Sequence, residues 1–308
     1  MSDATTRDAA TRDHRPISRR RFLRLATAAT AATAATLLAA GGVAQAYGEA
    51  VVESIELRLA GLTRTTRIAF LADLHVGPFV RRGSLTRWFD AALATRPDLI
   101  ALGGDIVDQR APRDLGPLFE EIERLVGSAR ADAGRGGVGS DRDDAVGAPL
   151  VVAVLGNHEY RRFRQPRPFL NDLRALGVTT LVNEGTLLDG GLYLAGADDH
   201  RHGRPDLRAT LAARPAGAPT VLLSHNPDLL PMVPTDVDLT LCGHTHGGQV
   251  RLPGIGPVVT SSTYGRRFAA GMVRGPALGY VSRGLGVGYL PIRWDCPPEV
   301  TVVTLRAA

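Results

Sequence analysis

The chain has 308 residues, of which 44% are hydrophobic, with 36 basic and 31 acidic residues and a formal net charge of +5 at pH 7. Residues 1–24 hold seven Arg and three Asp, so the rest of the chain carries 29 basic and 28 acidic residues. This nearly neutral body has no broad basic stripe, which argues against an enzyme that binds duplex DNA. The two cysteines, Cys242 and Cys296, are too few for a disulfide framework. For Cys242, which lies in an apolar strand run, we expect a buried free thiol, with a Cys242–Cys296 disulfide as the alternative.

The N-terminal segment, residues 1–46, predicts export. Residues 18–24 read Ser-Arg-Arg-Arg-Phe-Leu-Arg, which matches the twin-arginine signal pattern, and residues 25–46 follow without a charge. Ala44-Gln45-Ala46 offers a cleavage site, but an uncleaved N-terminal anchor is the alternative, because 22 uncharged residues can span a bilayer. The expected partner is the twin-arginine translocase, and a retained leader would associate with the membrane through residues 25–46. The expected location is the periplasm, the cell wall or the outer face of the cytoplasmic membrane.

Residues 47–308 predict one α/β domain. Residues 51–59 alternate apolar and polar side chains, which is typical of an edge or hairpin strand. Apolar runs predict buried strands at 68–71, 99–102, 150–155, 221–223 and 239–242, and helical spacing predicts helices at 84–95, 115–125 and 169–176. Residues 127–148 are mainly Gly, Ala, Asp and Arg, which predicts a flexible surface insertion.

Five short strings follow the predicted strands and contain five of the eight His residues. They are Asp73-Leu74-His75, Gly104-Asp105, Gly156-Asn157-His158-Glu159, Ser224-His225 and Gly243-His244-Thr245-His246. Ligands of open α/β sheets bind at the carboxyl ends of the strands, so we expect these strings to converge. Their Asp, Asn and His side chains form a nitrogen and oxygen ligand set that suits Mn, Fe or Zn. Seven ligands are too many for one tetrahedral ion and suffice for two divalent ions that share a carboxylate.

In this order, the strings resemble those of the calcineurin-like metallophosphoesterases. Finer features resemble the exported YkuE/YaeI-type phosphodiesterase branch, namely the strings at 243–249, 282–286 and 297–299. The resemblance covers roughly residues 50–306 and implies a four-layer α/β/β/α sandwich with a dinuclear metal site at the strand C-terminal ends. It also implies one ion held by Asp73, His75 and His246, a second held by Asn157, His225 and His244, and Asp105 as the bridge.

The expected activity is metal-dependent hydrolysis of phosphodiester or pyrophosphate substrates. Two bound cations lower the pKa of a bridging water, and the resulting hydroxide attacks phosphorus. His158 has no ion to bind in this scheme, so we expect it to assist the leaving group with a proton or a hydrogen bond. Asp108 and Glu159 are candidates for orienting the His ligands. Arg283 is a candidate contact for a substrate phosphate.

Two alternative functions stay open. The resembled branch implies lipid-linked or cell-envelope substrates, including cleavage of a UDP-2,3-diacylglucosamine-type pyrophosphate. A different class of protein, a non-catalytic exported metal-binding protein, would keep the ions only to stabilise the fold. His158 favours an enzyme, because a metal-binding protein has no use for a His that holds no ion. Residues 198–202, Asp-Asp-His-Arg-His, resemble another metal string, but we expect a polar loop near the mouth of the cleft, since the site is complete without them.

Overall fold

The computed structural model describes residues 39–133 and 150–308, together with Arg20, Arg24 and Thr36. Most of the twin-arginine string and of the uncharged segment 25–46 lies outside these described residues. Within them, no helix has the length and apolar character needed to cross a membrane. The export signal and the membrane association through residues 25–46 therefore stay predictions.

The first of two six-stranded sheets has the order β1-β14-β2-β3-β4-β5. Its strands are β1 (Val51–Leu59), β2 (Thr66–Leu71), β3 (Leu99–Leu102), β4 (Leu150–Ala153), β5 (Thr179–Thr180) and β14 (Glu299–Ala307). Strands β2 to β5 are parallel, whereas β14 runs antiparallel to β2 and parallel to β1. The edge strand expected at residues 51–59 is confirmed, because β1 pairs only with β14.

The second sheet has the order β12-β13-β9-β8-β7-β6. Its strands are β6 (Glu184–Leu187), β7 (Tyr193–Gly196), β8 (Thr220–Leu223), β9 (Leu239–Cys242), β12 (Gly271–Arg274) and β13 (Leu278–Val281). The four central strands are parallel, and β6 and β12 are antiparallel edges. Strands β8 and β9 therefore end on the same side of the sheet, just before two of the His strings.

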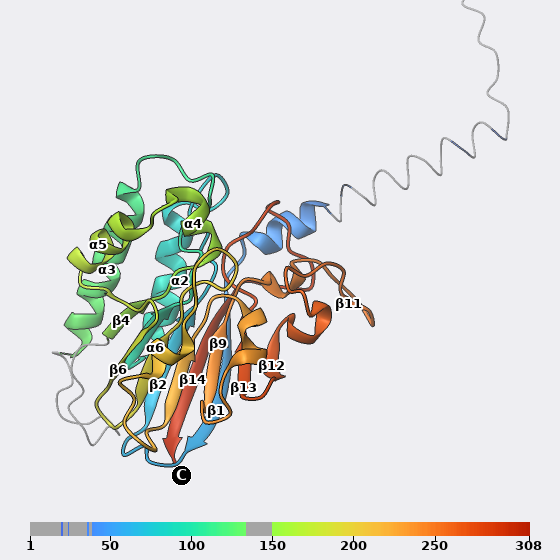
Figure 1. Ribbon diagram of the computed structural model, residues 1–308. Coiled ribbons are helices and arrows are strands. Elements are labelled where there is room, and N and C mark those ends of the chain that lie inside the picture. The colour runs from blue at the N-terminus through green and yellow to red at the C-terminus, as the bar shows by residue number, and fades with distance from the viewer. Residues whose placement is uncertain (1–19, 21–23, 25–35, 37–38, 134–149) are drawn as a thin grey trace, which may run out of the picture. The chain divides into compact units, whose positions relative to one another are not determined.

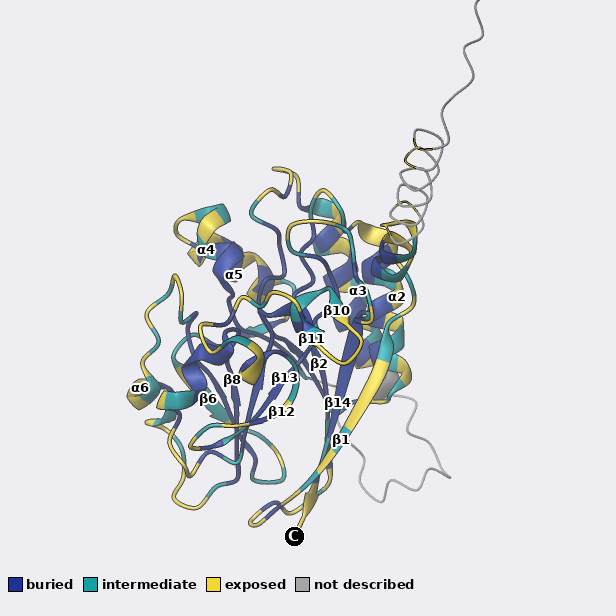
Figure 2. Ribbon diagram, turned by 90° about the vertical axis from the view of Figure 1, so that its right-hand side faces the viewer, coloured by how far each residue is buried: buried dark blue, intermediate teal, exposed yellow. Residues whose placement is uncertain are grey.

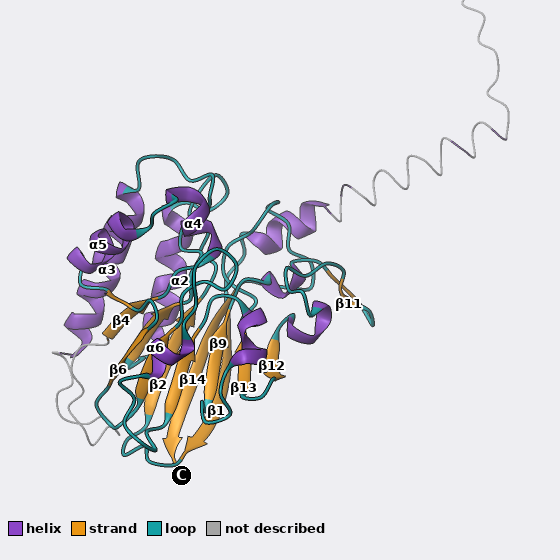
Figure 3. Ribbon diagram, in the orientation of Figure 1, coloured by secondary structure: helices purple, strands orange, loops and turns teal. Residues whose placement is uncertain are grey.

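Helices cover the outer faces of both sheets (Figures 1 and 3). Helices α2 (Arg82–Ala94), α3 (Gly116–Ala133) and α5 (Arg167–Ala175) lie against the first sheet, and α6 (Leu207–Leu211) and the 3-10 helix η1 (Pro227–Met232) lie against the second. The remaining short elements are α4 (Asn157–Phe163), η2 (His246–Gly248), η3 (Gly265–Phe268) and the hairpin strands β10 (Arg251–Leu252) and β11 (Gly256–Pro257).

The core follows from the alternation of side chains along each strand. In β2, Ala69 and Leu71 pack toward the helices, whereas Ile68 and Phe70 pack between the sheets, where residues of the second sheet such as Leu223 meet them. Figure 2 shows the central strands as buried. The predicted four-layer α/β/β/α sandwich is confirmed.

The start of the insertion predicted at residues 127–148 is too early in the chain. Helix α3 continues to Ala133, so residues 127–133 are its last turns. Val126 and Ala129 are buried in the cluster between α3 and the first sheet, which explains why the helix continues through a stretch rich in small residues. Residues 134–148 lie outside the described part of the chain.

The last residues of the expected leader pack with the folded body. The N–H of Arg293 donates to the carbonyl of Gly42 at 2.9 Å, and the N–H of Cys296 donates to Oε1 of Gln45 at 3.0 Å. Ala46 is buried. The compact body therefore begins at Gly42 rather than at residue 47. Both cysteines are buried and free, as expected for Cys242.

Candidate metal centre

The five strings meet at the carboxyl ends of strands from both sheets. Asp73 and His75 follow β2, Asp105 follows β3, and Asn157 follows β4 at the start of α4. The second sheet supplies the other three ligands, because His225 follows β8 while His244 and His246 follow β9. All seven side chains belong to buried residues.

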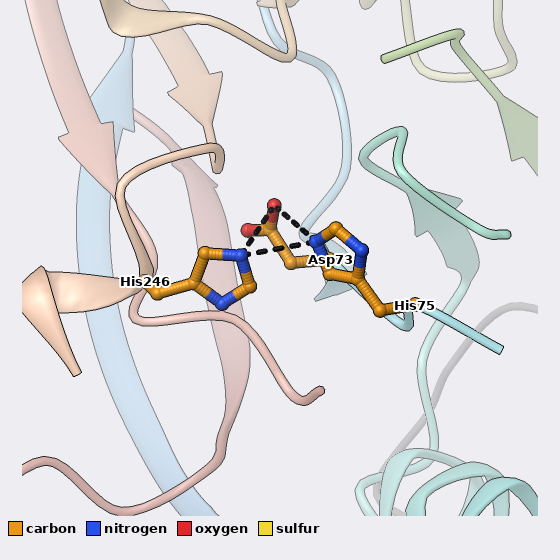
Figure 4. A group of neighbouring side chains, drawn as sticks. All are labelled: Asp73, His75 and His246. Carbon is orange, nitrogen blue, oxygen red and sulfur yellow. Dashed lines mark hydrogen bonds and ion pairs between the residues drawn. The ribbon is translucent and has the colours of Figure 1, made fainter. Parts of the chain in front are cut away.

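One group of ligands consists of Asp73, His75 and His246. Figure 4 shows the three side chains pointing toward one another. The Nε2 atoms of His75 and His246 are 3.0 Å apart, and Oδ1 of Asp73 lies 3.9 Å from the first and 3.7 Å from the second. This spacing fits a single metal ion surrounded by three protein ligands.

A second group consists of Asp105, His225 and His244. Nε2 of His225 lies 3.3 Å from Nδ1 of His244 and 3.3 Å from Oδ2 of Asp105. The same Oδ2 is 3.5 Å from Nε2 of His75 in the first group. Although burial raises the pKa of Asp105, the neighbouring His225 and His75 hold it well below its usual range. Asp105 is thus an ionised carboxylate between the two groups, where a bridging ligand would have to be.

The backbone at the site is held in an unusual conformation. Five of the seven expected ligands have positive φ angles between 49° and 72°: Asp73, His75, Asp105, His244 and His246. Such left-handed conformations are uncommon outside Gly and each cost roughly 1 kcal/mol or more. Gly104 is also at positive φ, and a Cβ there would lie 2.8 Å from the backbone nitrogen of Gly156. The loops are therefore closely packed in the conformation that makes the ligands converge.

The donor set fits two divalent cations. Nδ1 of His225 lies 2.9 Å from the carbonyl oxygen of Gly103, which can only accept, so Nδ1 carries a hydrogen and Nε2 is the ring nitrogen that could bind an ion. Oδ1 of Asn157 is buried and has no hydrogen-bond partner. An unsatisfied buried oxygen costs free energy, and a bound cation would remove that cost. The facing Nε2 atoms of His75 and His246 likewise need a cation or a proton between them.

His158 differs from the ligand histidines in which nitrogen carries the hydrogen. The backbone N–H of Gln109 donates to Nδ1 of His158 at 3.1 Å. The hydrogen of the neutral ring is therefore on Nε2, which lies 3.9 Å from Oδ2 of Asp105. Burial lowers the pKa of His158 to about 4, so the ring is neutral at pH 7. The spacing of His158 from His75 and Asp105 could hold a metal ion, but an Nε2 that carries hydrogen has no lone pair to give.

Glu159 contacts the backbone of the site rather than a His ring. Its carboxylate accepts hydrogen bonds from the N–H groups of Gly156 at 2.8 Å, Asp105 at 3.0 Å and Val107 at 3.0 Å. Burial raises the pKa of Glu159 to about 7. Glu159 therefore fixes the loop that carries Asp105, which differs from the expected role of orienting a His ligand.

Asp108 lies beside the rings that it was expected to orient. Its Oδ2 is 3.7 Å from Nδ1 of His75 and 3.8 Å from Nδ1 of His158, which are electrostatic rather than hydrogen-bonding distances. Arg110 donates to both carboxylate oxygens, through Nε at 2.9 Å and a terminal nitrogen at 3.0 Å. Asp108 therefore lies next to Nδ1 of His75, the ring nitrogen that faces away from the other ligands, and interacts with it electrostatically.

A pocket of about 280 Å³ opens over the site, and Asp105, Asn157, His158, His244 and His246 contribute to its lining. Two arginines that the sequence analysis did not single out also line it, Arg161 from α4 and Arg201 from the loop after β7. Nε of Arg161 donates to Nε2 of His202 at 2.8 Å. The string at 198–202 was expected to form a polar loop at the cleft mouth, and the position of Arg201 confirms this.

Arg283 has a different role from the one expected. Its Nε donates to Glu299 at 2.6 Å and a terminal nitrogen donates to Glu53 at 2.6 Å. Glu299 is buried in β14, so its carboxylate needs a cationic partner. Arg283 does not contribute to the lining of the pocket. We therefore withdraw it as a candidate contact for a substrate phosphate.

The fold and the site define a metal-dependent hydrolase of phosphoesters. The model of the calcineurin-like phosphoesterase family matches residues 66–248, and the chain belongs to this family. It is 30% identical over 248 residues to the uncharacterized metallophosphoesterase YkuE of Bacillus subtilis, covering 78% of this chain and 79% of that protein. It is 31% identical over 247 residues to the phosphodiesterase YaeI of Escherichia coli, covering 78% and 82%. A dimetal phosphatase from Danio rerio superposes with a TM-score of 0.41 at 14% identity, covering 80% of this chain and all of the other.

Proposed function

We propose that this protein hydrolyses phosphodiester or pyrophosphate bonds with two divalent ions, Mn, Fe or Zn, and with His158 assisting the leaving group. The observation that carries the proposal is that Nδ1 has opposite hydrogen-bond partners in two rings of the site. Nδ1 of His225 faces the carbonyl of Gly103, which leaves its Nε2 for an ion, whereas Nδ1 of His158 accepts from the N–H of Gln109, which puts the hydrogen of the neutral ring on Nε2. A site built only to hold ions needs the first arrangement and has no use for the second.

Each part of the site has a task in this reaction. When bound, the two ions would acidify a water between them and neutralise charge on the phosphoryl oxygens. Asp105 joins the two ligand groups, and Glu159 fixes its backbone. The Nε2–H of His158 donates a hydrogen bond to the oxygen that leaves phosphorus. Arg161 and Arg201 supply positive charge at the pocket and attract the anionic substrate.

The preference for a diester is supported by the similarity to YaeI, which is described as a phosphodiesterase. We further propose export by the twin-arginine route, which the Arg pair and the uncharged segment at 25–46 support. An exported enzyme of this kind would act on phosphoesters of the cell envelope.

The proposed function can be tested with the purified full chain loaded separately with Mn, Fe and Zn. We expect hydrolysis of bis(4-nitrophenyl) phosphate with at least one metal, and slower hydrolysis of 4-nitrophenyl phosphate. Absence of turnover of either compound with all three metals, in protein that retains two ions by elemental analysis, would refute the proposal. Faster turnover of the monoester would refute the preference for diesters.

A further inference from the structure

A group of large apolar side chains is exposed beside the pocket. We call it the apolar rim, and it consists of Leu252, Ile255, Val258 and Val259 in and after the β10–β11 hairpin, together with Tyr289 and Leu290. The exposed fraction is 71% for Val259 and Tyr289 and 61% for Leu290. Single exposed apolar residues are ordinary, but six on two neighbouring loops form a patch of the kind that marks an interaction site. Figure 1 shows the hairpin projecting away from the two sheets.

The rim is continuous with the candidate metal centre. Val259, Tyr289 and Leu290 line the same pocket as His158 and Asp105. The two loops are also fixed to each other, because Nε2 of Gln249 donates to the carbonyl of Leu290 at 3.0 Å. A ligand whose phosphate reaches the metal ligands would therefore have apolar side chains next to its other end.

The segment that carries the rim is cationic. Residues 239–294 contain six Arg and no Asp or Glu. Arg283 and Arg293 are used internally, in the ion pairs of Arg283 and in the hydrogen bonds of the buried Arg293. Arg266 and Arg267 on η3 are exposed, and Arg251 in the hairpin is half-buried. Apolar side chains flanked by Arg are complementary to a bilayer with anionic headgroups, where apolar burial and charge attraction act together.

The leader also ends at the rim. Gly42 contacts the loop that bears Tyr289 and Leu290, because its carbonyl accepts the N–H of Arg293. A Cβ at Gly42 would lie 2.7 Å from the side chain of Ile292, which also lines the pocket. Residues 42–46, the described end of the uncharged segment, therefore pack beside this loop.

We propose that the apolar rim docks on an anionic lipid bilayer and that the substrate is an amphiphilic phosphoester drawn from it. In this arrangement the phosphate reaches the metal centre while the apolar part of the substrate stays along Val259, Tyr289 and Leu290. The choice of substrate rests on the proposed phosphoesterase function, whereas the docking of the rim does not.

The docking is tested with an indole placed on the rim of the full chain. The Tyr289→Trp variant is mixed with vesicles of phosphatidylcholine and brominated phosphatidylglycerol, since bromine quenches an indole that enters the bilayer. The matched control is Leu187→Trp, at a residue that is 52% exposed on the edge strand β6. Both variants keep the leader, so binding through the leader alone brings both to the vesicle. We expect strong quenching at position 289 and little above background at 187, and equal quenching of the two would overturn the proposal.

A second measurement asks whether the rim contributes affinity. Leu252→Glu combined with Ile255→Glu should weaken partitioning onto phosphatidylglycerol vesicles about tenfold, because it replaces apolar contact with charge repulsion. Leu187→Glu should leave partitioning unchanged. Unchanged partitioning of the double variant would contradict the proposal, as would a dimer of the full chain that the double variant dissociates, since the rim would then bind a second copy.

The proposed phosphoesterase function and the proposed docking of the apolar rim can be refuted independently. Turnover of bis(4-nitrophenyl) phosphate by the unsubstituted protein, without quenching at position 289, would overturn the docking and leave the proposed function intact. Quenching at position 289 without turnover would overturn the proposed function and leave the docking intact.

Discussion

The backbone N–H of Gln109 donates to Nδ1 of His158 at 3.1 Å and thereby determines which nitrogen of that ring faces the pocket as a donor. Gln109 belongs to the loop after β3, the same loop that presents Asp105. One short segment therefore supplies Asp105, the proposed bridging carboxylate, and also sets the tautomer of the neighbouring His. This coupling gives the proposed catalytic role of His158 a structural basis that is independent of the metals.

Substitution His158→Ala should remove activity and keep the metals. Loss of a group that assists the leaving oxygen typically lowers kcat by about 10²-fold to 10⁴-fold. None of the seven proposed ligand side chains has a hydrogen bond to the His158 ring, so two ions should remain by elemental analysis. A matched control is His200→Ala, at a residue that lines a separate pocket near α6. Loss of one ion from His158→Ala would show that His158 is a ligand.

The two ligand groups predict the metal content of three variants. Asp73→Ala should release the ion held with His75 and His246, and Asn157→Ala should release the ion held with His225 and His244. Asp105→Ala should release both, because its carboxylate lies between the groups. Elemental analysis of dialysed protein should therefore give about one ion for Asp73→Ala, about one for Asn157→Ala and about zero for Asp105→Ala. Two ions retained by Asp105→Ala would contradict the bridging assignment.

The ligand positions could be predicted because each lies directly after an apolar run that forms a strand. The order of strands in a parallel sheet then places the ends together, whatever their separation in the sequence. The role of Arg283 could not be predicted this way, because it depends on Glu53 in β1 and Glu299 in β14, which belong to the other sheet. The tautomer of His158 could not be predicted either, because it depends on one backbone N–H. The apolar rim could not be predicted because it is formed by two loops that lie about thirty residues apart in the sequence.

The two arginines Arg201 and Arg283 should respond in opposite ways to substitution. Arg201→Ala should raise KM for a phosphodiester, because Arg201 lines the pocket, and should leave the stability within about 0.5 kcal/mol. Arg283→Ala should leave KM unchanged and lower the free energy of unfolding by about 3 kcal/mol, because the buried Glu299 loses its cationic partner. Steady-state kinetics and urea unfolding of both variants check these expectations. A raised KM for Arg283→Ala would restore it as a substrate contact.

Substitution Glu159→Gln should destabilise the loop of the bridging carboxylate. Oε2 of Glu159 accepts from the N–H groups of both Gly156 and Asp105, and Oε1 accepts from Val107. An amide has only one oxygen, so its NH₂ group must face at least one of these N–H donors. A buried donor without an acceptor costs about 1–3 kcal/mol, and we expect a loss of that size in urea unfolding of metal-free protein.

The control for Glu159 is Glu184→Gln on the exposed strand β6, which should change stability by less than about 0.5 kcal/mol. Metal-free protein is needed, because bound ions stabilise the folded state by mass action and would add their own contribution. Titration of the ions back into Glu159→Gln should then show weaker binding, since the backbone of Asp105 is no longer fixed. Unchanged stability together with unchanged metal affinity would show that the three N–H groups find other acceptors and that Glu159 does not fix this loop.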